Sequence, residues 1–174
     1  MYFLEEPYVS IRSFFEAGGN VLWGIFVVTM LMWALIVERV WFFRANMPHI
    51  FRAAIHEWEQ RTDKTSWHAL RIREQIVSQV SLAAHKNISV IQVLMVLLPL
   101  LGLLGTVTGM IQVFNVMAVA GTSNARLMAG GVSAATIPTM SGLVAALSGL
   151  YLAAQLKKRA DTIVHSLENI LCES

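Results

Sequence analysis

The main feature of the hydrophobic pattern is a long apolar stretch in the second half of the chain. Between Asn87 and Leu156 the only charged residue is Arg126. A helix that spans a membrane needs about 20 mainly apolar residues, so this stretch is long enough for two spans joined near Arg126. The pattern predicts the second span, an external loop and the third span at residues 88–120, 121–129 and 130–156.

An earlier apolar run predicts one more span. The chain has no charge from Val21 to Val37, and Glu38, Arg39 and a cluster of aromatic residues follow. Large aromatic side chains beside a span are typical of the membrane interface. We expect this first span at residues 21–43, after an external amino-terminal segment at residues 1–20. The acidic residues of that segment argue against a cleaved signal peptide.

The polar region between the first two spans, residues 44–87, has the composition of a helical segment. It contains no glycine and one proline, Pro48. A turn-like run, TDKTS, occupies residues 62–66, and apolar residues then recur at helical spacing. We expect one helix from Trp67 into the second span, which at 1.5 Å per residue is about 80 Å long and projects beyond the membrane. This projection serves either packing within the subunit, which we favour, or assembly with a partner.

Basic residues are distributed unequally around the three spans. One arginine precedes the first span and one lies between the second and third, whereas all other lysines and arginines follow the first or the third span. Because basic loops stay in the cytoplasm, we expect an external amino terminus and a cytoplasmic tail at residues 157–174. The second and third helices would then extend into the cytoplasm. Acidic residues are interspersed with the basic ones, so no nucleic-acid partner is expected.

The composition fits an all-α membrane protein. Of the 174 residues, 56% are hydrophobic and 14% are charged, and the mean hydropathy is +0.59. These values are too apolar for a soluble domain of this length. The histidines lack the spacing of paired metal ligands, and no phosphate-binding loop, nucleophile elbow or pair of catalytic carboxylates is present. We therefore expect no metal, no cofactor and no enzymatic activity.

Small residues mark one face of the second span and recur in the third. They fall three or four positions apart, which places them on one side of a helix. Small residues let helix backbones approach closely within lipid. Proline in the third span also bends a helix and frees a carbonyl group. The small-residue face either packs helices together or lines a pore, and its members are Gly102, Gly105, Gly109, Pro138 and Gly142.

Hydroxyl side chains supply much of the polarity of these two spans. Thr106 and Thr108 lie in the second span, and Ser133, Thr136 and Thr139 lie in the third. Each hydroxyl can bond to a backbone carbonyl one turn earlier, which is the common arrangement. The hydroxyls of the third span can also compensate for the proline kink. The alternative is that they face a wet interior.

No Asp, Glu, Lys or His occurs between Asn87 and Leu156. The chain therefore cannot bind and release a proton at mid-membrane with its own side chains. If it belongs to a proton-driven machine, another polypeptide must supply the titratable group. Glu38 stands next to the first span, and we expect it to form an interfacial ion pair with Arg39.

The order of the spans and two sequence motifs resemble those of the ExbB/TolQ/MotA proton-channel family. They are most similar to those of the ExbB proteins of accessory TonB systems. The motifs are LLGLLGTVTGMI at residues 100–111 and GVSAATIPTMSGLVAA at residues 131–146. The resemblance implies a homo-oligomeric ring, a pentamer in this family, in the bacterial inner membrane with a periplasmic amino terminus. Its second and third helices would line a pore around ExbD-like single-span partners, whose aspartate carries protons to energise TonB-dependent uptake.

The same resemblance assigns roles to individual residues. The pore threonines of the family correspond to Thr106 and Thr139, which would offer hydroxyl groups to the partner's carboxylate or to nearby water. Thr136 and Ser133 would extend this proton pathway. Many family members have a glutamate early in the third span where this chain has Ala134. A proton path here cannot use that carboxylate.

Two other functions remain open. A TolQ-like or flagellar-stator-like subunit would belong to a related motor, although a stator is expected to have a longer cytoplasmic region with charged residues that generate torque. A passive membrane scaffold would use its small-residue faces only to pack helices.

Overall fold

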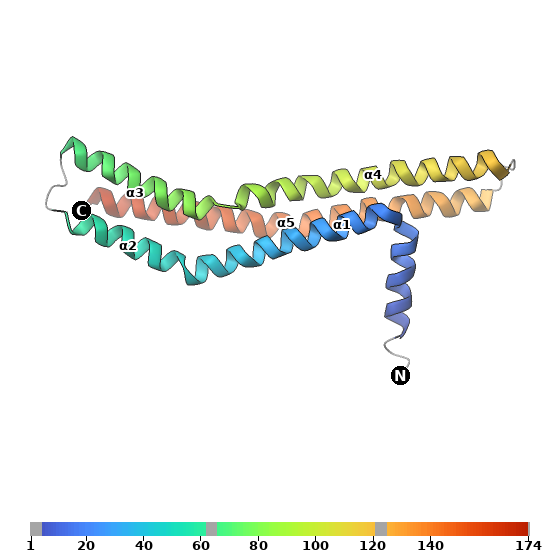
Figure 1. Ribbon diagram of the computed structural model, residues 1–174, viewed down its shortest axis with the longest axis horizontal. Helices are drawn as coiled ribbons and strands as arrows, with labels where there is room; N and C mark the ends of the chain where they lie inside the picture. Colours follow the sequence, from blue (N-terminus) through green and yellow to red (C-terminus); the bar gives the residue numbers. More distant parts are fainter. Residues whose placement is uncertain (1–4, 62–65, 121–124, 174) are drawn as a thin grey trace. The chain divides into compact units, whose positions relative to one another are not determined.

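The computed structural model describes residues 5–61, 66–120 and 125–173, and side chains within residues 19–61, 66–118 and 129–172. The described residues form helices and no strand (Figure 1). The expected turn at residues 62–65, most of the loop at 121–129 and the side chains of residues 1–18 lie outside the described part. The helices are α1 (Glu5–Ala45), α2 (Met47–Glu59), α3 (Trp67–His85), α4 (Ile88–Ala120) and α5 (Ala125–Glu173).

Three helical stretches are long and apolar enough to cross a membrane. They are Gly19–Ala45, Trp67–Ala118 and Ala129–Cys172. The prediction of an all-α membrane protein with three spans is confirmed. α1 changes direction at Gly19, whose φ of 64° lies in the left-handed region that glycine adopts without steric cost.

The continuous helix expected from Trp67 into the second span is interrupted once. α3 ends at His85 and α4 begins at Ile88. Between them Asn87 has a φ of 62°. Asparagine adopts this left-handed conformation more readily than most residues, so it can end one helix just before the next begins. At the other end of α3, Ser66 is the N-cap and accepts a hydrogen bond from the His68 N–H at 3.1 Å, as the turn-like run predicts.

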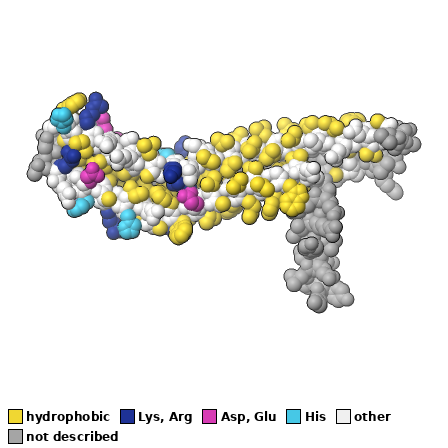
Figure 2. Space-filling model, viewed as in Figure 1, with side chains coloured by type: hydrophobic (Ala, Val, Ile, Leu, Met, Phe, Trp, Pro, Cys, Tyr) yellow, Lys and Arg dark blue, Asp and Glu magenta, His cyan; other side chains and the backbone are white. Residues whose placement is uncertain are grey.

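The chain divides into two compact units, each built from separate stretches of sequence. We call Met1–Met32 with Val93–Gly149 the apolar unit, and Trp33–Gln92 with Leu150–Ser174 the polar unit. None of the described side chains of the apolar unit is charged. The charged and histidine side chains visible in Figure 2 therefore belong to the polar unit.

In the apolar unit, α1 packs against α4 and α5. Leu22, Ile25 and Met32 of α1 are buried there. A Cβ atom added to Gly149 of α5 would lie 2.5 Å from Met32 Sδ, and one on Gly105 of α4 would lie 3.5 Å from Val21 Cγ1. Glycine thus allows the close contacts on both neighbouring helices.

The polar unit is a helical bundle in which α2 and α3 pack along the carboxyl-terminal part of α5 (Figure 1). Each helix buries residues at intervals of three, four or seven positions, which is the spacing of one helical face. The polar segment at residues 44–87 therefore packs within the subunit, as we favoured from the sequence. The buried residues are Met47, Ala54 and Trp58 of α2, Ala69, Ile76, Val80 and Ala84 of α3, and Ala153, Leu156, Ala160, Leu167 and Leu171 of α5.

Candidate functional site in the apolar helices

The glycines of α4 form the contact surface with α5. A Cβ atom on Gly102 would lie 2.9 Å from Thr139 Cα, and one on Gly109 would lie 2.6 Å from Ala135 Cβ. A Cβ atom on Gly105 would overlap the ring of Pro138. These helices approach so closely that the positions on α4 have no room for a side chain.

The same contact continues along α5 at Gly142. A Cβ atom there would lie 2.6 Å from the carbonyl oxygen of Leu98 and 3.4 Å from Gly102 Cα. Both are backbone atoms, which cannot move aside without shifting the helix. The small-residue faces of the two spans therefore pack against each other within one subunit.

Thr106 and Thr139 meet at a single carbonyl group. The Thr139 hydroxyl donates a hydrogen bond to Gly102 O at 2.8 Å, from α5 to α4. In an α-helix the same carbonyl accepts from the N–H four residues later, which belongs to Thr106. The sequence motifs place these threonines in separate spans. In the structure the backbone N–H of Thr106 and the hydroxyl of Thr139 share one acceptor.

The Thr106 side chain itself bonds within α4. Its hydroxyl donates to Leu103 O at 2.7 Å, and that of Thr108 donates to Leu104 O and Gly105 O, both at 3.0 Å. This local bonding is the common arrangement expected from the sequence. Thr106 and Thr108 are both half-buried.

The hydroxyl residues nearer the start of α5 are more exposed. Ser133 and Thr136 are both exposed, and the Thr136 hydroxyl donates to Ser133 O at 2.8 Å. Pro138 has no N–H, so the carbonyl left without its helical donor is that of Ala134. The Thr136 hydroxyl therefore does not compensate for the kink by bonding to that carbonyl. These two residues present polar groups to the surroundings of the subunit.

A charged cluster in the polar unit was only partly foreseen. The expected ion pair between Glu38 and Arg39 is present, with 3.3 Å between Arg39 Nε and Glu38 Oε2. The burial of Arg39 was not predicted from the sequence: only 2% of its side chain is exposed. Its Nη1 donates to Ala83 O at 3.4 Å, and Asn87 Nδ2 donates to Glu38 Oε2 at 3.4 Å. The cluster thus joins α1 to the break between α3 and α4.

A second polar contact in this unit was missed from the sequence. His85 Nε2 of α3 lies 2.8 Å from Asp161 Oδ1 of α5. The two residues are 76 positions apart, and neither belongs to a motif. The one available signal was that each stands close to the apolar face of its helix. No group of three or more potential metal ligands occurs among the residues that the structure describes.

Comparison with known proteins identifies the family of this chain. A family model described as the MotA/TolQ/ExbB proton channel family matches residues 44–169. A search of curated proteins finds no match. The matched range includes both threonines at the Gly102 carbonyl, Asn87 and most of α5, whereas Glu38 and Arg39 lie before it. Since it covers well over half of the sequence, this chain belongs to the MotA/TolQ/ExbB proton channel family.

Proposed function

We propose that the chain is an ExbB-like, non-enzymatic subunit of a proton-driven motor in the bacterial inner membrane. Together with an ExbD-like single-span partner, it would use the proton motive force to energise TonB-dependent uptake across the outer membrane. The subunits would form a homo-oligomeric ring, a pentamer by family resemblance. The distribution of basic residues supports a periplasmic amino terminus and a cytoplasmic carboxyl terminus.

The observation that carries this proposal is that the second and third spans of a proton-channel subunit have no carboxylate, lysine or histidine of their own. No Asp, Glu, Lys or His occurs between Asn87 and Leu156. A proton cannot cross a roughly 30 Å hydrocarbon core without groups that bind or relay it. A partner helix with a carboxyl group at mid-membrane would supply the missing function.

The hydrogen bonds suggest how the threonines would act on that carboxyl group. The protons of the Thr106 and Thr139 hydroxyls are already donated to backbone carbonyls. Each hydroxyl oxygen keeps lone pairs that accept hydrogen bonds. The two threonines would therefore accept a hydrogen bond from the protonated form of the partner's carboxyl group, or from water beside it.

Ser133 and Thr136 would continue the pathway towards the periplasmic end of α5. Both are exposed on the subunit, so both are open to water or to a partner helix. The half-buried Ala134 next to them offers no carboxylate. In this chain the pathway would depend on hydroxyl groups and water at the level where many relatives have a glutamate.

Co-reconstitution with the partner tests the proposal. The partner is sought as the product of a neighbouring gene with one amino-terminal span and a mid-span aspartate. Proteoliposomes that contain both proteins should conduct protons, and Asp→Asn in the partner or Thr106→Val in this chain should abolish the flux. Thr108→Val is the matched control, because its hydroxyl also bonds within α4. Full flux with Thr106→Val and Thr139→Val would refute the assignment of these threonines.

A passive scaffold is the second candidate, and the tight α4–α5 contact favours it. The packing of α4 against α5 within one subunit is enough to explain the small-residue faces, without a pore. A scaffold would leave proton leak unchanged when the partner is added.

The domain structure of the partner distinguishes an ExbB-like complex from a stator-like one, since a peptidoglycan-binding domain would indicate a stator-like complex.

A further inference from the structure

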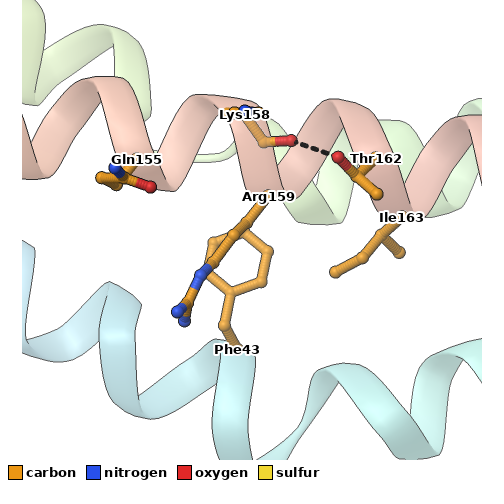
Figure 3. Close-up of a pocket in the computed structure, with 6 residues that line it drawn as sticks. All are labelled: Phe43, Gln155, Lys158, Arg159, Thr162 and Ile163. Carbon is orange, nitrogen blue, oxygen red and sulfur yellow. Dashed lines mark hydrogen bonds between the residues drawn. The ribbon is translucent and has the colours of Figure 1, made fainter.

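A pocket in the polar unit lies between the end of α1 and the middle of α5. It encloses about 410 Å³ and is lined by Phe43, Gln155, Lys158, Arg159, Thr162 and Ile163. Figure 3 shows Arg159 reaching from α5 towards α1 beside the Phe43 ring. The pocket therefore combines a basic side with an apolar wall.

No acidic side chain in the described part of the protein pairs with the basic groups of this pocket. None of its lining residues is acidic. Among the described residues, neither Lys158 nor Arg159 takes part in an ion pair. The carboxylate of Asp161, two positions after Arg159, is instead paired with His85 of α3 at 2.8 Å.

The hydrogen-bonding groups of the pocket also favour an anion. Arg159, Lys158 and the amide of Gln155 all carry N–H donors, and a guanidinium group can bind two oxygens of a phosphate at once. The Thr162 hydroxyl donates its proton to Lys158 O at 2.8 Å, so it is not a free donor. The ligand must bring oxygen acceptors and negative charge.

The position of the pocket along the helices indicates the membrane surface. Arg159 comes three residues after Leu156, where the apolar stretch ends, and this is about 4.5 Å along the helix. Phe43 comes six residues after Val37, or about 9 Å. The headgroup layer is roughly 5 to 8 Å thick on each side of the hydrocarbon core. Arg159 thus falls within the headgroup layer, at the depth of lipid phosphates, and Phe43 falls at its outer edge.

We infer that this pocket binds the phosphodiester group of an anionic phospholipid, with Arg159 as its main contact and with Phe43 and Ile163 bordering the headgroup on the side away from the hydrocarbon core. A basic pocket between helices at the membrane surface is a recognised type of lipid site. The inference does not depend on proton transport by the complex. It requires only that the three apolar helices span a bilayer.

Native mass spectrometry of the full-length protein in mild detergent tests this inference. The probe is an equimolar mixture of phosphatidylglycerol and phosphatidylcholine. We expect preferential retention of phosphatidylglycerol by the wild-type protein. Because a basic side chain near the surface contributes about 1 kcal/mol, Arg159→Gln should weaken that retention about fivefold. Lys158→Gln should weaken it as well.

Lys157→Gln is the matched control. It removes the same charge from the same turn of α5, but residue 157 does not line the pocket and projects about 200° away from residue 159. It should leave the preference intact. The inference is overturned if the wild-type protein shows no preference, or if Lys157→Gln lowers retention as much as Arg159→Gln. It is also overturned if inorganic phosphate displaces the lipid, or if Arg159→Gln dissociates subunits without changing lipid retention.

Discussion

The hydroxyl of Thr139 donates a hydrogen bond to the carbonyl oxygen of Gly102, 2.8 Å away on the neighbouring helix. This bond is possible because the helices are in near-contact, with a hypothetical Gly102 Cβ only 2.9 Å from Thr139 Cα. The small residue and the hydroxyl are therefore parts of one arrangement. Glycine brings the backbones together, and threonine uses the carbonyl that this approach brings within reach.

Replacing Thr139 by valine should have a small effect on stability. The Gly102 carbonyl keeps its helical N–H donor, so no buried acceptor is left unsatisfied. Hydrogen bonds between membrane helices contribute about 0.6 kcal/mol on average, and we expect a loss of that size in the free energy of unfolding measured by SDS titration. Thr139→Ser keeps the hydroxyl and should unfold like the wild type. A loss in Thr139→Ser with none in Thr139→Val would show that the methyl group matters and the hydrogen bond does not.

Gly142→Ala should be much more disruptive. The added methyl would lie 2.6 Å from Leu98 O, and this backbone atom can move only with α4. Overpacking of this kind costs about 1–3 kcal/mol, which SDS titration of the purified protein can resolve. Gly24→Ala on α1 is the control, because nothing lies within 4 Å of its added methyl. It should be neutral or stabilise the protein, since alanine is the better helix former. Similar losses in both variants would contradict the tight α4–α5 contact.

The three spans could be predicted from the sequence because lipid imposes a strong compositional signal. A run from Asn87 to Leu156 with one charged residue has few structural alternatives in any protein. The small-residue spacing also indicated close helix packing. It could not show which surfaces meet, because the same spacing suits contact within a subunit and contact around a pore.

The polar contacts were harder to predict, for a physical reason. The break at Asn87 depends on a backbone conformation that asparagine tolerates but does not require. Arg39 next to a span suggested an interfacial ion pair with Glu38, and only the packing of α1 against α3 buries its side chain. Such contacts depend on relative helix register, which periodicity within one helix does not determine.

The contact between His85 and Asp161 should contribute modestly to the stability of the polar unit. Their side chains are 36% and 46% exposed, so water screens the interaction. The other ring nitrogen, Nδ1, lies 2.9 Å from Ser81 O, and only a ring protonated on both nitrogens donates to both acceptors. We expect a double-mutant cycle of His85→Ala and Asp161→Ala to give a coupling of about 0.5 kcal/mol in the free energy of unfolding.

Arg71 and Glu74 provide the control for this cycle. They form an ion pair within α3 at 3.4 Å, and both side chains are 66% exposed. Their coupling should be smaller than that of His85 with Asp161, which joins two helices. Equal couplings would indicate that the contact between α3 and α5 adds nothing beyond an ordinary surface pair.

Arg39→Ala should destabilise the polar unit more than any change of an exposed charge. The variant removes a buried side chain and the donor to Ala83 O, and it takes the cation from the Phe42 ring, whose centroid is 4.8 Å from Arg39 Cζ. Ala83 lies in the last turn of α3, where carbonyls lack helical donors, and the Lys86 N–H already bonds to Leu82 O. Loss of packing together with an unsatisfied carbonyl should cost about 2–4 kcal/mol in the free energy of unfolding.

Two further variants separate the possible causes of that loss. Arg44→Ala removes an exposed charge near the end of the same helix and should change stability by no more than about 0.5 kcal/mol. Arg39→Met keeps an apolar stem but removes the charge and the donor. Its loss should be smaller than that of Arg39→Ala, because a well-packed apolar side chain can replace a buried charge at little cost. Hydrogen exchange at the amides of residues 86 and 87 should accelerate in both Arg39 variants if the arginine holds the end of α3 in place. Unchanged exchange there, despite lower stability, would mean that Arg39 fills space without fixing the break between α3 and α4.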